Sequence, residues 1–525
     1  MATGKVYLVG AGPGDPKLIT VRGLEALRRS DVVVYDRLAG PQLLHEIPAG
    51  ADRIYVGKRP DRHTMKQEDI SRLLVDLALQ GKTVTRLKGG DPTVFGRVGE
   101  EAELLKQHGI PYEIVPGITS AISVPAYAGI PVTHRDLASS FSVITGHESP
   151  DKLDRSIHWD KVTHATGTLV FLMGVAKIGY IAGQLMKHGR PPETPVALVR
   201  WGTRAEQATL VGTLRDIEAK VRASDFQPPA VIVVGEVVRQ RETLRWIEDK
   251  PLFGLRILVT RARSQASELA ERIDELGGEP YPFPVIETRP ASGPEADEQA
   301  RQALERPESY DWVVLTSVNG VEFFFRCLEA QGVDIRRFHR AEFAAVGPKT
   351  AEALRRRGVV PALLPDRYQA EGLLDALQGR LLPGGKALLP RGNLASGDLP
   401  RELARRGIDP VELVVYETAM AATRDEALLE MLQGGDIHVV TFTSSSTVTN
   451  LLEALRRMGE SDPARLLGKA RIACIGPATA RAAEANGLTV HIVPEQSTID
   501  SLLQAIAGWN LSARRTGAGE NLEGA

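Results

Sequence analysis

The chain has 525 residues, 43% apolar and 25% charged, an ordinary composition for a globular protein of three or four domains. Its 64 basic and 66 acidic side chains nearly cancel, which argues against a nucleic-acid-binding surface, and no apolar run approaches the roughly 20 residues that span a bilayer. The two cysteines, Cys327 and Cys474, predict buried thiols without a disulfide framework or metal site. Because no leader pattern opens the sequence, we expect a cytoplasmic protein.

Residues 5 to about 240 alternate between strand and helix patterns, which predicts an α/β fold. The segment 239–250 is charged and poor in strand-forming residues, and it predicts a linker into a new unit that begins with a strand at 256–260. The expected strands before it are 6–9, 31–35, 83–87, 112–115, 141–145, 169–173, 196–199 and 230–234, with helices including 67–79 and 100–106.

Two glycine-rich loops follow predicted strands in this half: Gly10-Ala-Gly-Pro-Gly-Asp15 and Gly89-Gly-Asp-Pro92. At the carboxyl end of a strand, paired glycines let the backbone approach a ligand closely, and Asp91 offers an acceptor for hydroxyl or ammonium groups. Asp15 occupies the third glycine position of the dinucleotide fingerprint, where its carboxylate would oppose a pyrophosphate. The loops therefore predict a small-molecule site and disfavour a nicotinamide-dependent oxidoreductase.

Several single residues in this half have both a functional and a structural interpretation. Asp36 follows a buried strand, as an active-site carboxylate or a helix cap, and Lys58 follows a short strand, as a site residue or a solvated side chain. Thr119 and Ser120 lie in a loop where they line a pocket or cap a helix, and Met173 ends a strand that is otherwise ordinary core.

The second half contains an internal repeat with an offset close to 130 residues. Segments 258–261, 286–288, 315–317 and 346–351 match segments 388–391, 416–418, 442–444 and 475–480. This repeat predicts two similar α/β lobes with a cleft between them, a common place for a ligand. After about Trp509 the sequence loses its periodicity, and we expect disorder there.

The first half resembles the uroporphyrinogen-III C-methyltransferases of the tetrapyrrole methylase family over about residues 5–245. The matching segments, in order, are VYLVGAGPGDP, VVYDRL, VGKR, RLKGGDPTVFGR, VPGITS, GIPVTHRD, ITGH, FLMG and VALVRWGT. The resemblance implies S-adenosylmethionine as methyl donor, uroporphyrinogen III as acceptor, precorrin-2 as product and a homodimer. The chain departs from the family's usual residues at Val98, at Ser120 and at the pair Arg200-Trp201.

The resemblance also assigns roles to individual residues of this chain. It implies Asp36 as proton acceptor and Lys58 as proton donor, and Arg37, Arg135 and Lys58 are candidate partners for the substrate's carboxylates. A corrinoid methylase acting on another ring carbon is the weaker alternative, because the VVYDRL and RLKGGDP segments are complete. The implied donor-site residues are Pro13, Gly89, Gly90, Asp91, Val94, Thr119, Ser120, Met173 and Gly202.

The second half resembles uroporphyrinogen-III synthase over about residues 253–507, on the segments ILVTRA, LTSVNGVEFFF, VGPKTAEAL, LLPRGNLASGDLP, VVYETA, VTFTSSSTV and IGPATARAA. The resemblance implies cyclisation of hydroxymethylbilane with inversion of the last pyrrole ring and without a cofactor or metal. Tyr416 is the candidate for assisting hydroxyl departure, unless it is a packing residue. Loops of hydroxyl residues after strands suit carboxylate binding, with helix capping as the alternative; the candidates are Thr350, Thr479, Ser444, Ser445 and Ser446.

Together these patterns predict a bifunctional enzyme acting on small-molecule tetrapyrroles, with neither nucleic acid nor membrane as a partner. We expect a tetrapyrrole methylase-type two-lobed α/β unit (1–245), a linker (246–254), a two-lobed α/β synthase-like unit (255–509) and a disordered tail (510–525). Lobe one of the synthase-like unit would comprise 255–288 and 415–509, and lobe two 289–414. In the alternative, the second half binds tetrapyrroles without catalysis.

Overall fold

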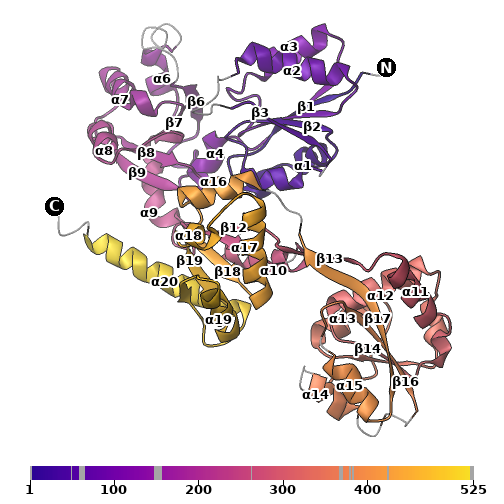
Figure 1. The fold of residues 1–525 in the computed structure, drawn as a ribbon. Helices are drawn as coiled ribbons and strands as arrows, with labels where there is room; N and C mark the ends of the chain where they lie inside the picture. The colour runs from indigo at the N-terminus through magenta and orange to yellow at the C-terminus, as the bar shows by residue number, and fades with distance from the viewer. Residues whose placement is uncertain are drawn as a thin grey trace.

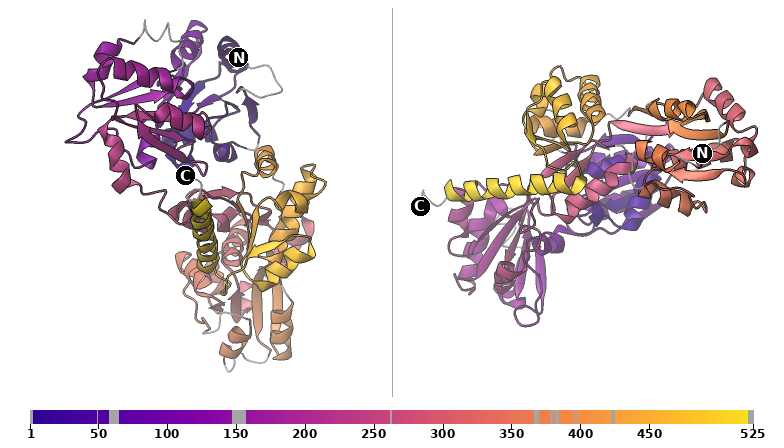
Figure 2. Two further views of the ribbon diagram at one scale, coloured as in Figure 1. Left: turned by 90° about the vertical axis from the view of Figure 1, so that its left-hand side faces the viewer. Right: turned by 90° about the horizontal axis from the view of Figure 1, so that it is seen from below.

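The computed structural model describes residues 3–48, 50–57, 65–146, 157–261, 263–365, 370–377, 380, 384–395, 397–421 and 425–520. Within them the chain forms four five-stranded sheets, two in each half, which we number one to four in chain order. The predicted α/β fold with two lobes in each half is confirmed. Figure 1 and the left panel of Figure 2 show the first half at one end, sheet three in the middle and sheet four at the far end.

Sheet one is parallel throughout, so the carboxyl ends of its strands meet at one edge. Alternate residues face opposite sides: Leu8 packs with the helices α2 and α3, and Val9 packs with α1. The strand order is β3-β2-β4-β1-β5, from β1 (Val6–Gly10), β2 (Val32–Tyr35), β3 (Asp52–Tyr55), β4 (Val84–Lys88) and β5 (Tyr112–Val115). The helices are η1 (Pro16–Leu18), α1 (Val21–Arg28), η2 (Pro41–Glu46), α2 (Gln67–Leu79), α3 (Val98–Gln107) and α4 (Ser120–Tyr127).

Sheet two is mixed, in the order β6-β7-β10-β8-β9, and only its β6–β7 pair is parallel. Helix α4 leaves sheet one and packs on sheet two, which joins the two lobes. The strands are β6 (Phe141–Thr145), β7 (Thr168–Leu172), β8 (Pro195–Arg200), β9 (Ala208–Thr213) and β10 (Ala230–Val234). The helices are α6 (Trp159–Ala165), η3 (Val175–Lys177), α7 (Ile178–Lys187), α8 (Ile217–Ala223), η4 (Glu236–Gln240) and α9 (Arg241–Leu244).

The short strand predicted before Lys58 corresponds to β3, whereas β9 was missed, because it is an edge strand of mostly half-exposed or exposed residues and lacks a buried apolar run. The predicted linker packs against the first half. The Trp246 ring lies 5.2 Å from that of Tyr127, and its indole nitrogen donates to the carbonyl of Ala126 over 3.1 Å. The guanidinium of Arg241 donates to Glu248 over 3.0 Å.

Sheet three has the order β12-β11-β18-β19-β20 and is parallel. Its strands are β11 (Arg256–Val259), β12 (Glu279–Pro282), β18 (Val439–Phe442), β19 (Arg471–Cys474) and β20 (Val490–Ile492). The helices around it are α10 (Arg263–Glu275), α16 (Glu426–Gly434), α17 (Ser445–Arg457), α18 (Pro463–Leu467), α19 (Pro477–Ala485) and α20 (Ile499–Glu520).

Sheet four has the order β13-β17-β16-β14-β15, in which only the β13–β17 pair is antiparallel. Its strands are β13 (Ile286–Pro290), β14 (Trp312–Leu315), β15 (Glu342–Ala345), β16 (Lys386–Gly392) and β17 (Asp409–Met420). The helices are α11 (Pro294–Ala303), η5 (Pro307–Ser309), α12 (Val318–Ala330), η6 (Ile335–Phe338), α13 (Pro348–Arg356), α14 (Ala370–Ala376) and α15 (Asp398–Arg405).

The internal repeat corresponds to these two sheets strand by strand. The order β12-β11-β18-β19 in sheet three matches β17-β16-β14-β15 in sheet four. Thr288 and Thr418, which the repeat aligns with each other, stand opposite one another in the antiparallel β13–β17 pair. The repeat is therefore a pseudo-twofold arrangement with its axis at this pair, and β13 and β17 both belong to sheet four.

The expectation of disorder beyond residue 509 was wrong for residues 510–520, because α20 continues to Glu520 and projects well beyond its sheet (Figures 1 and 2). The amide of Asn510 donates to the carbonyls of Pro251 and Phe253 over 2.8 and 3.3 Å. Arg514 also donates to the Phe253 carbonyl, so the tail docks on the linker. Residues 521–525 lie outside the described residues.

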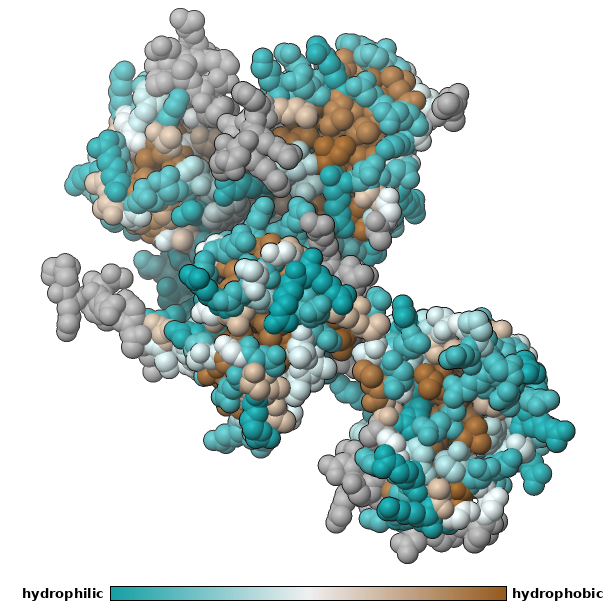
Figure 3. All heavy atoms as spheres, viewed as in Figure 1, coloured by the Kyte–Doolittle hydropathy of each residue, from teal (hydrophilic) through white to brown (hydrophobic). Residues whose placement is uncertain are grey.

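Both cysteines are free, as predicted, and burial raises the pKa of Cys474 to about 12. Among the described residues, no helix is long and apolar enough to cross a membrane. Figure 3 shows a broad hydrophobic area over the lobe that contains sheet one. The visible faces of the second half, around sheets three and four, are mostly hydrophilic.

Candidate active site

Three glycines bring the ends of β1, β4 and β5 into backbone contact. A Cβ atom on Gly10 would lie 2.6 Å from the Gly117 Cα and from the Gly90 carbonyl oxygen. The Gly90 amide donates to the Gly12 carbonyl over 2.7 Å, and the Gly12 amide donates to the Gly90 carbonyl over 3.2 Å. Gly90 itself has φ +68°, a backbone conformation that favours glycine. The two glycine-rich loops predicted from the sequence therefore form one structure.

Asp91 ties these loops together. One carboxylate oxygen accepts from the Thr93 amide over 2.7 Å and also from its hydroxyl, and the other accepts from the Gly117 amide over 2.9 Å. The side chain is buried, with 9% of its surface exposed. We expected Asp91 to be an acceptor for ligand groups, but its oxygens are largely engaged in holding the loops.

Helix α4 joins the predicted site residues of the two sheets. Thr119 is its N-cap and accepts from the Ala121 amide over 3.3 Å, so the capping interpretation is confirmed for Thr119. A Cβ on Gly90 would lie 3.7 Å from the Ser120 amide nitrogen, and a Cβ on Gly202 would lie 2.5 Å from a methyl of Val124. The glycine loop of sheet one and the loop after β8 of sheet two therefore both abut α4.

The remaining predicted donor-site residues lie in the loops around this helix. Pro13 belongs to the Gly10–Asp15 loop, and Val94 packs with α4 and sheet two. Met173 follows β7 with φ +58° and 49% of its surface exposed, a strained conformation for a large side chain on the surface. Such strain at an exposed residue is typical of a functional site.

Asp36, at the end of β2, is held by the neighbouring strand. One oxygen accepts from Arg86 over 3.0 Å and the other from the Leu38 amide over 3.1 Å. Behind it, the Glu101 carboxylate lies 3.6 Å from Arg86 and 2.7 Å from the Lys88 ammonium. Glu101 is fully buried, and burial lowers the pKa of Lys88 although Glu101 opposes that shift. Lys58 lies outside the described residues.

Arg37 lies close to the loop after β8 of sheet two, whereas Arg135 lies exposed on a separate turn between His134 and Ala138. The Arg37 guanidinium lies 5.4 Å from the centre of the Trp201 ring, and the Arg204 guanidinium lies 4.9 Å from it. The departure from the family pattern at Trp201 thus links the Asp36–Arg37 segment to the loop that contains Gly202.

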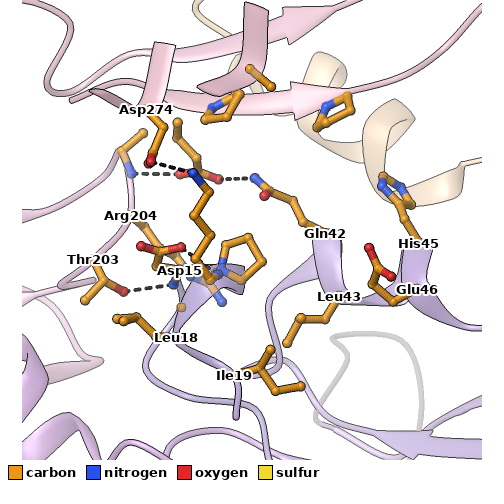
Figure 4. Close-up of a pocket in the computed structure, with 18 of the residues that line it drawn as sticks. Asp15, Leu18, Ile19, Gln42, Leu43, His45, Glu46, Thr203, Arg204 and Asp274 are labelled. Atoms are coloured by element: carbon orange, nitrogen blue, oxygen red, sulfur yellow. Dashed lines mark hydrogen bonds and ion pairs between the residues drawn. The ribbon is translucent and has the colours of Figure 1, made fainter. Parts of the chain in front are cut away.

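A cavity of about 1700 Å³ lies beside these loops, at the junction of the two halves. Figure 4 shows Asp15, Thr203 and Arg204 facing Gln42 and Asp274 across it. Burial raises the pKa of Asp15, whose carboxylate accepts from the Tyr127 hydroxyl over 2.9 Å. The lining contains paired charges, such as the contact of 2.7 Å between Lys17 and Asp274.

In the second half, hydroxyl residues start the helices that follow the strands. Ser444 is the N-cap of α17 in a capping box with Thr447, and Ser445 and Ser446 are exposed beside it. Thr350 and Thr479 are 4% and 5% exposed. Both threonines lie in the first turns of the helices α13 and α19, and their contact with a substrate stays a prediction.

The start of α13 contacts lobe one, because the Lys349 ammonium lies 3.0 Å from the Glu268 carboxylate of α10. Tyr416 stacks on Phe323 at 5.4 Å, and a Cβ on Gly392 would meet its ring at 2.6 Å. Its ring thus has a packing function whatever its hydroxyl does.

Sequence reasoning missed three groups at these sites. Arg86 and Lys88 are buried cations at alternate positions of a fully buried strand, and that alternation was a signal of a charged site. Arg261 follows β11 at the carboxyl edge of sheet three, and burial lowers its pKa. The contacts of Trp201 had no signal beyond the departure from the family pattern.

Comparisons with known proteins match both halves. The family model for Tetrapyrrole (Corrin/Porphyrin) Methylases matches residues 5–218, and that for Uroporphyrinogen-III synthase HemD matches residues 267–504. The Porphyrin biosynthesis protein HemD of Ruminiclostridium josui is 38% identical over 506 residues, which cover 96% of this chain and 98% of that protein.

Other relatives match the first half alone. The Uroporphyrinogen-III C-methyltransferase of Priestia megaterium is 55% identical over 235 residues, covering 45% of this chain and 98% of that protein. A crystal structure of uroporphyrin-III C-methyl transferase from Thermus thermophilus with S-adenyl homocysteine is 41% identical, covers 45% of this chain and 99% of its own, and has a TM-score of 0.39.

The glycine packing can be tested by Gly10→Ala. Because the added methyl group meets only backbone atoms, the loops after β4 and β5 must move, and we expect a loss of about 1–3 kcal/mol in the free energy of unfolding of the first half. Denaturant unfolding measures this, and hydrogen exchange in residues 89–93 and 117–120 should accelerate. Gly99→Ala, on the exposed face of α3 with no atom within 4 Å, is the matched control and should not destabilise. Equal stability of the two variants would contradict the packing argument.

Proposed function

Because this chain belongs to the tetrapyrrole methylases in its first half and to the uroporphyrinogen-III synthases in its second, we propose that it converts hydroxymethylbilane to precorrin-2. The second half would close the macrocycle as uroporphyrinogen III, and the first half would methylate that product at two ring carbons. The observation that carries the proposal is the convergence of the glycine loops, the start of α4 and Asp36 at one edge of sheet one. We also propose that it works in the cytoplasm as a homodimer through the first half.

The residues around α4 suit a methyl donor. The space beside Gly90 contains only the start of α4 within 4 Å, so a ligand can approach the backbone there. We propose that the donor is held by Pro13, Gly89, Gly90, Val94, Thr119, Ser120, Met173 and Gly202, with Asp91 fixing the loops. When bound, S-adenosylmethionine supplies an electrophilic methyl group. The chain's contribution is to orient the acceptor carbon toward that group, and such positioning supplies much of the acceleration in a bimolecular transfer.

After methyl transfer the macrocycle must lose a proton, and Asp36 is our proposed acceptor. Arg86 and the Leu38 amide fix its carboxylate at the end of a rigid strand, within the edge where the loops converge. A base held in this way contributes about 10²–10⁴-fold to turnover. Lys58 is our proposed proton donor, and the exposed cations Arg37 and Arg135 are proposed to pair with substrate carboxylates.

In the second half, we propose that the cleft between the lobes folds the linear tetrapyrrole for ring closure. Ser444, Ser445 and Ser446 would hydrogen-bond its carboxylates, and Arg261 would add a positive charge at the end of β11. Hydroxide leaves the terminal carbon with a proton, which gives water, and Tyr416 would assist that departure. Because the species left by the loss of water forms readily, the main requirement on the protein is to orient the ends of the linear tetrapyrrole for ring closure.

The whole proposal is tested by supplying purified protein with hydroxymethylbilane. Without S-adenosylmethionine we expect uroporphyrinogen III, and with it we expect precorrin-2. A buffer control without protein gives the spontaneous type-I isomer. If the protein methylates added uroporphyrinogen III but leaves hydroxymethylbilane to form type I, the second half only binds tetrapyrroles.

Asp36→Asn tests the proton acceptor. The amide still accepts from the Leu38 amide but is not a base, so kcat for methylation should fall about 10²–10⁴-fold while calorimetry shows unchanged affinity for S-adenosylhomocysteine. Asp69→Asn, which neutralises an exposed carboxylate on α2, is the control and should behave as the parent protein. Parental turnover by Asp36→Asn would remove Asp36 from the mechanism.

Tyr416→Phe tests the proposed acid of ring closure. Because the ring keeps its packing on Phe323, the fold should survive, and slower enzymatic closure should raise the share of type-I isomer measured by chromatography. Tyr310→Phe removes a hydroxyl from the same lobe that donates to the Ala303 carbonyl over 2.7 Å, and it should leave the isomer ratio unchanged. An unchanged ratio in Tyr416→Phe would leave Tyr416 a packing residue.

A further inference from the structure

The loop between β8 and β9, residues 201–207, contains Gly202 of the proposed donor site and is conformationally strained. Trp201 and Thr203 have φ +45° and +74°, a region that costs side-chain-bearing residues free energy and persists only where the surroundings enforce it. The Thr203 hydroxyl accepts from the Asp15 amide over 3.0 Å, which couples this loop to the glycine-rich loop after β1.

Restraints on this loop come from the first half and the linker at its end. The side-chain oxygen of Gln207 accepts from the Thr203 amide over 2.9 Å, and its side-chain nitrogen donates to the Tyr127 carbonyl and to the Glu248 carboxylate over 3.2 and 3.1 Å. The first bond closes the loop on itself, and the other two anchor its end to the first half and to the linker. Ala205 and Glu206 lie at the turn between Thr203 and Gln207.

Two residues of the second half hold that outer turn. Glu279, at the start of β12, accepts from the Ala205 amide over 2.8 Å. Arg256, at the start of β11, donates to Glu206 over 2.7 Å and to both oxygens of Glu279 over 2.8 and 2.9 Å. Glu279 also accepts from Gln42 of η2 over 3.1 Å, so one carboxylate contacts two segments of the first half.

We propose that Glu279 and Arg256 of the synthase-like half are positioning residues for the methyl-donor loop of the methylase half, so that docking of the second half sets the donor affinity of the first. This inference rests on the proposed function for the identity of the donor. The restraint on the loop is independent of it.

The burial of this cluster makes the restraint effective. The Arg256 side chain is 3% exposed and that of Glu279 is 16% exposed, so water competes weakly for their hydrogen bonds. Burial alone would raise the pKa of Glu206, but the charge and hydrogen bond of Arg256 lower it below its usual value. Exposed ion pairs, by contrast, contribute little.

A second contact between the halves provides a matched control. His45 of η2 lies 2.9 Å from Asp425, and its ring packs edge-on against Tyr281 at 5.5 Å. This contact joins the same two halves through partly buried groups, and it touches no residue of the loop 201–207. A variant at His45 therefore separates loss of docking from loss of the loop restraint.

The test uses the full chain with Glu279→Ala, Glu279→Gln, Glu206→Gln and His45→Asn. Calorimetry with S-adenosylhomocysteine should give a dissociation constant about five- to tenfold higher for Glu279→Ala. It should be two- to fivefold higher for Glu279→Gln and Glu206→Gln, each of which keeps an acceptor oxygen, and unchanged for His45→Asn. Hydrogen exchange at residues 203–207 should accelerate in the same order. Glu206→Gln leaves sheet three untouched, so it tests the proposal even if Glu279→Ala folds poorly.

Three results would overturn the inference. The first is parental affinity and parental exchange in Glu279→Ala and Glu206→Gln. The second is an equal loss of affinity in His45→Asn, since the effect would then belong to docking in general. The third is unchanged exchange at 203–207 in every variant. If the parent protein binds no S-adenosylhomocysteine, the proposed function fails, whereas accelerated exchange in Glu279→Ala would still establish the restraint on the loop.

Discussion

The close approach of Gly10, Gly90 and Gly117 is the constraint on which the first half depends. A parallel sheet brings the carboxyl ends of β1, β4 and β5 to one edge, but ordinary residues there would keep the loops apart. With glycine at all three positions the backbones touch, and the amides and carbonyls of Gly12 and Gly90 bond each other. The start of α4 can then reach the same point, and α4 joins sheet one to sheet two.

The charges buried beneath this edge explain how a candidate base is held without a flexible loop. Arg86 and Lys88 point from β4 toward α2 and α3, and two unpaired cations there would be costly. Glu101 of α3 contacts both cations, and Asp36 supplies the second negative charge by accepting a hydrogen bond from Arg86. Charges of alternating sign thus run from Lys88 through Glu101 and Arg86 to Asp36, and they join β4, α3 and the end of β2. These contacts position the Asp36 carboxylate more firmly than its own backbone would.

Local signals predicted much of this structure. The alternation of strand and helix patterns predicted the α/β sheets, the glycine-rich segments predicted loops of a small-molecule site at strand ends, and the repeat predicted two matching lobes. What the sequence did not predict depends on partners far away in the chain. Asn510 orders the tail because its amide reaches carbonyls near residue 252, and Asp91 closes the loops because Gly117 is folded beside it. For Thr350 and Thr479 carboxylate binding stays a prediction, because a hydroxyl in a helix start does not reveal whether the helix end is open or covered.

The pseudo-twofold repeat also explains how lobe one of the second half contacts the first half. In sheet four the outer side of β17 is covered by β13, whereas its counterpart β12 in sheet three is an edge strand. An uncovered edge invites unwanted strand pairing, and β12 carries Pro280 and Pro282, which have no amide hydrogen to donate. Glu279 begins this strand and directs its carboxylate to the Ala205 amide and to Gln42. The edge that the repeat leaves open is thereby a polar docking surface, and it contacts the loop 201–207 of the first half.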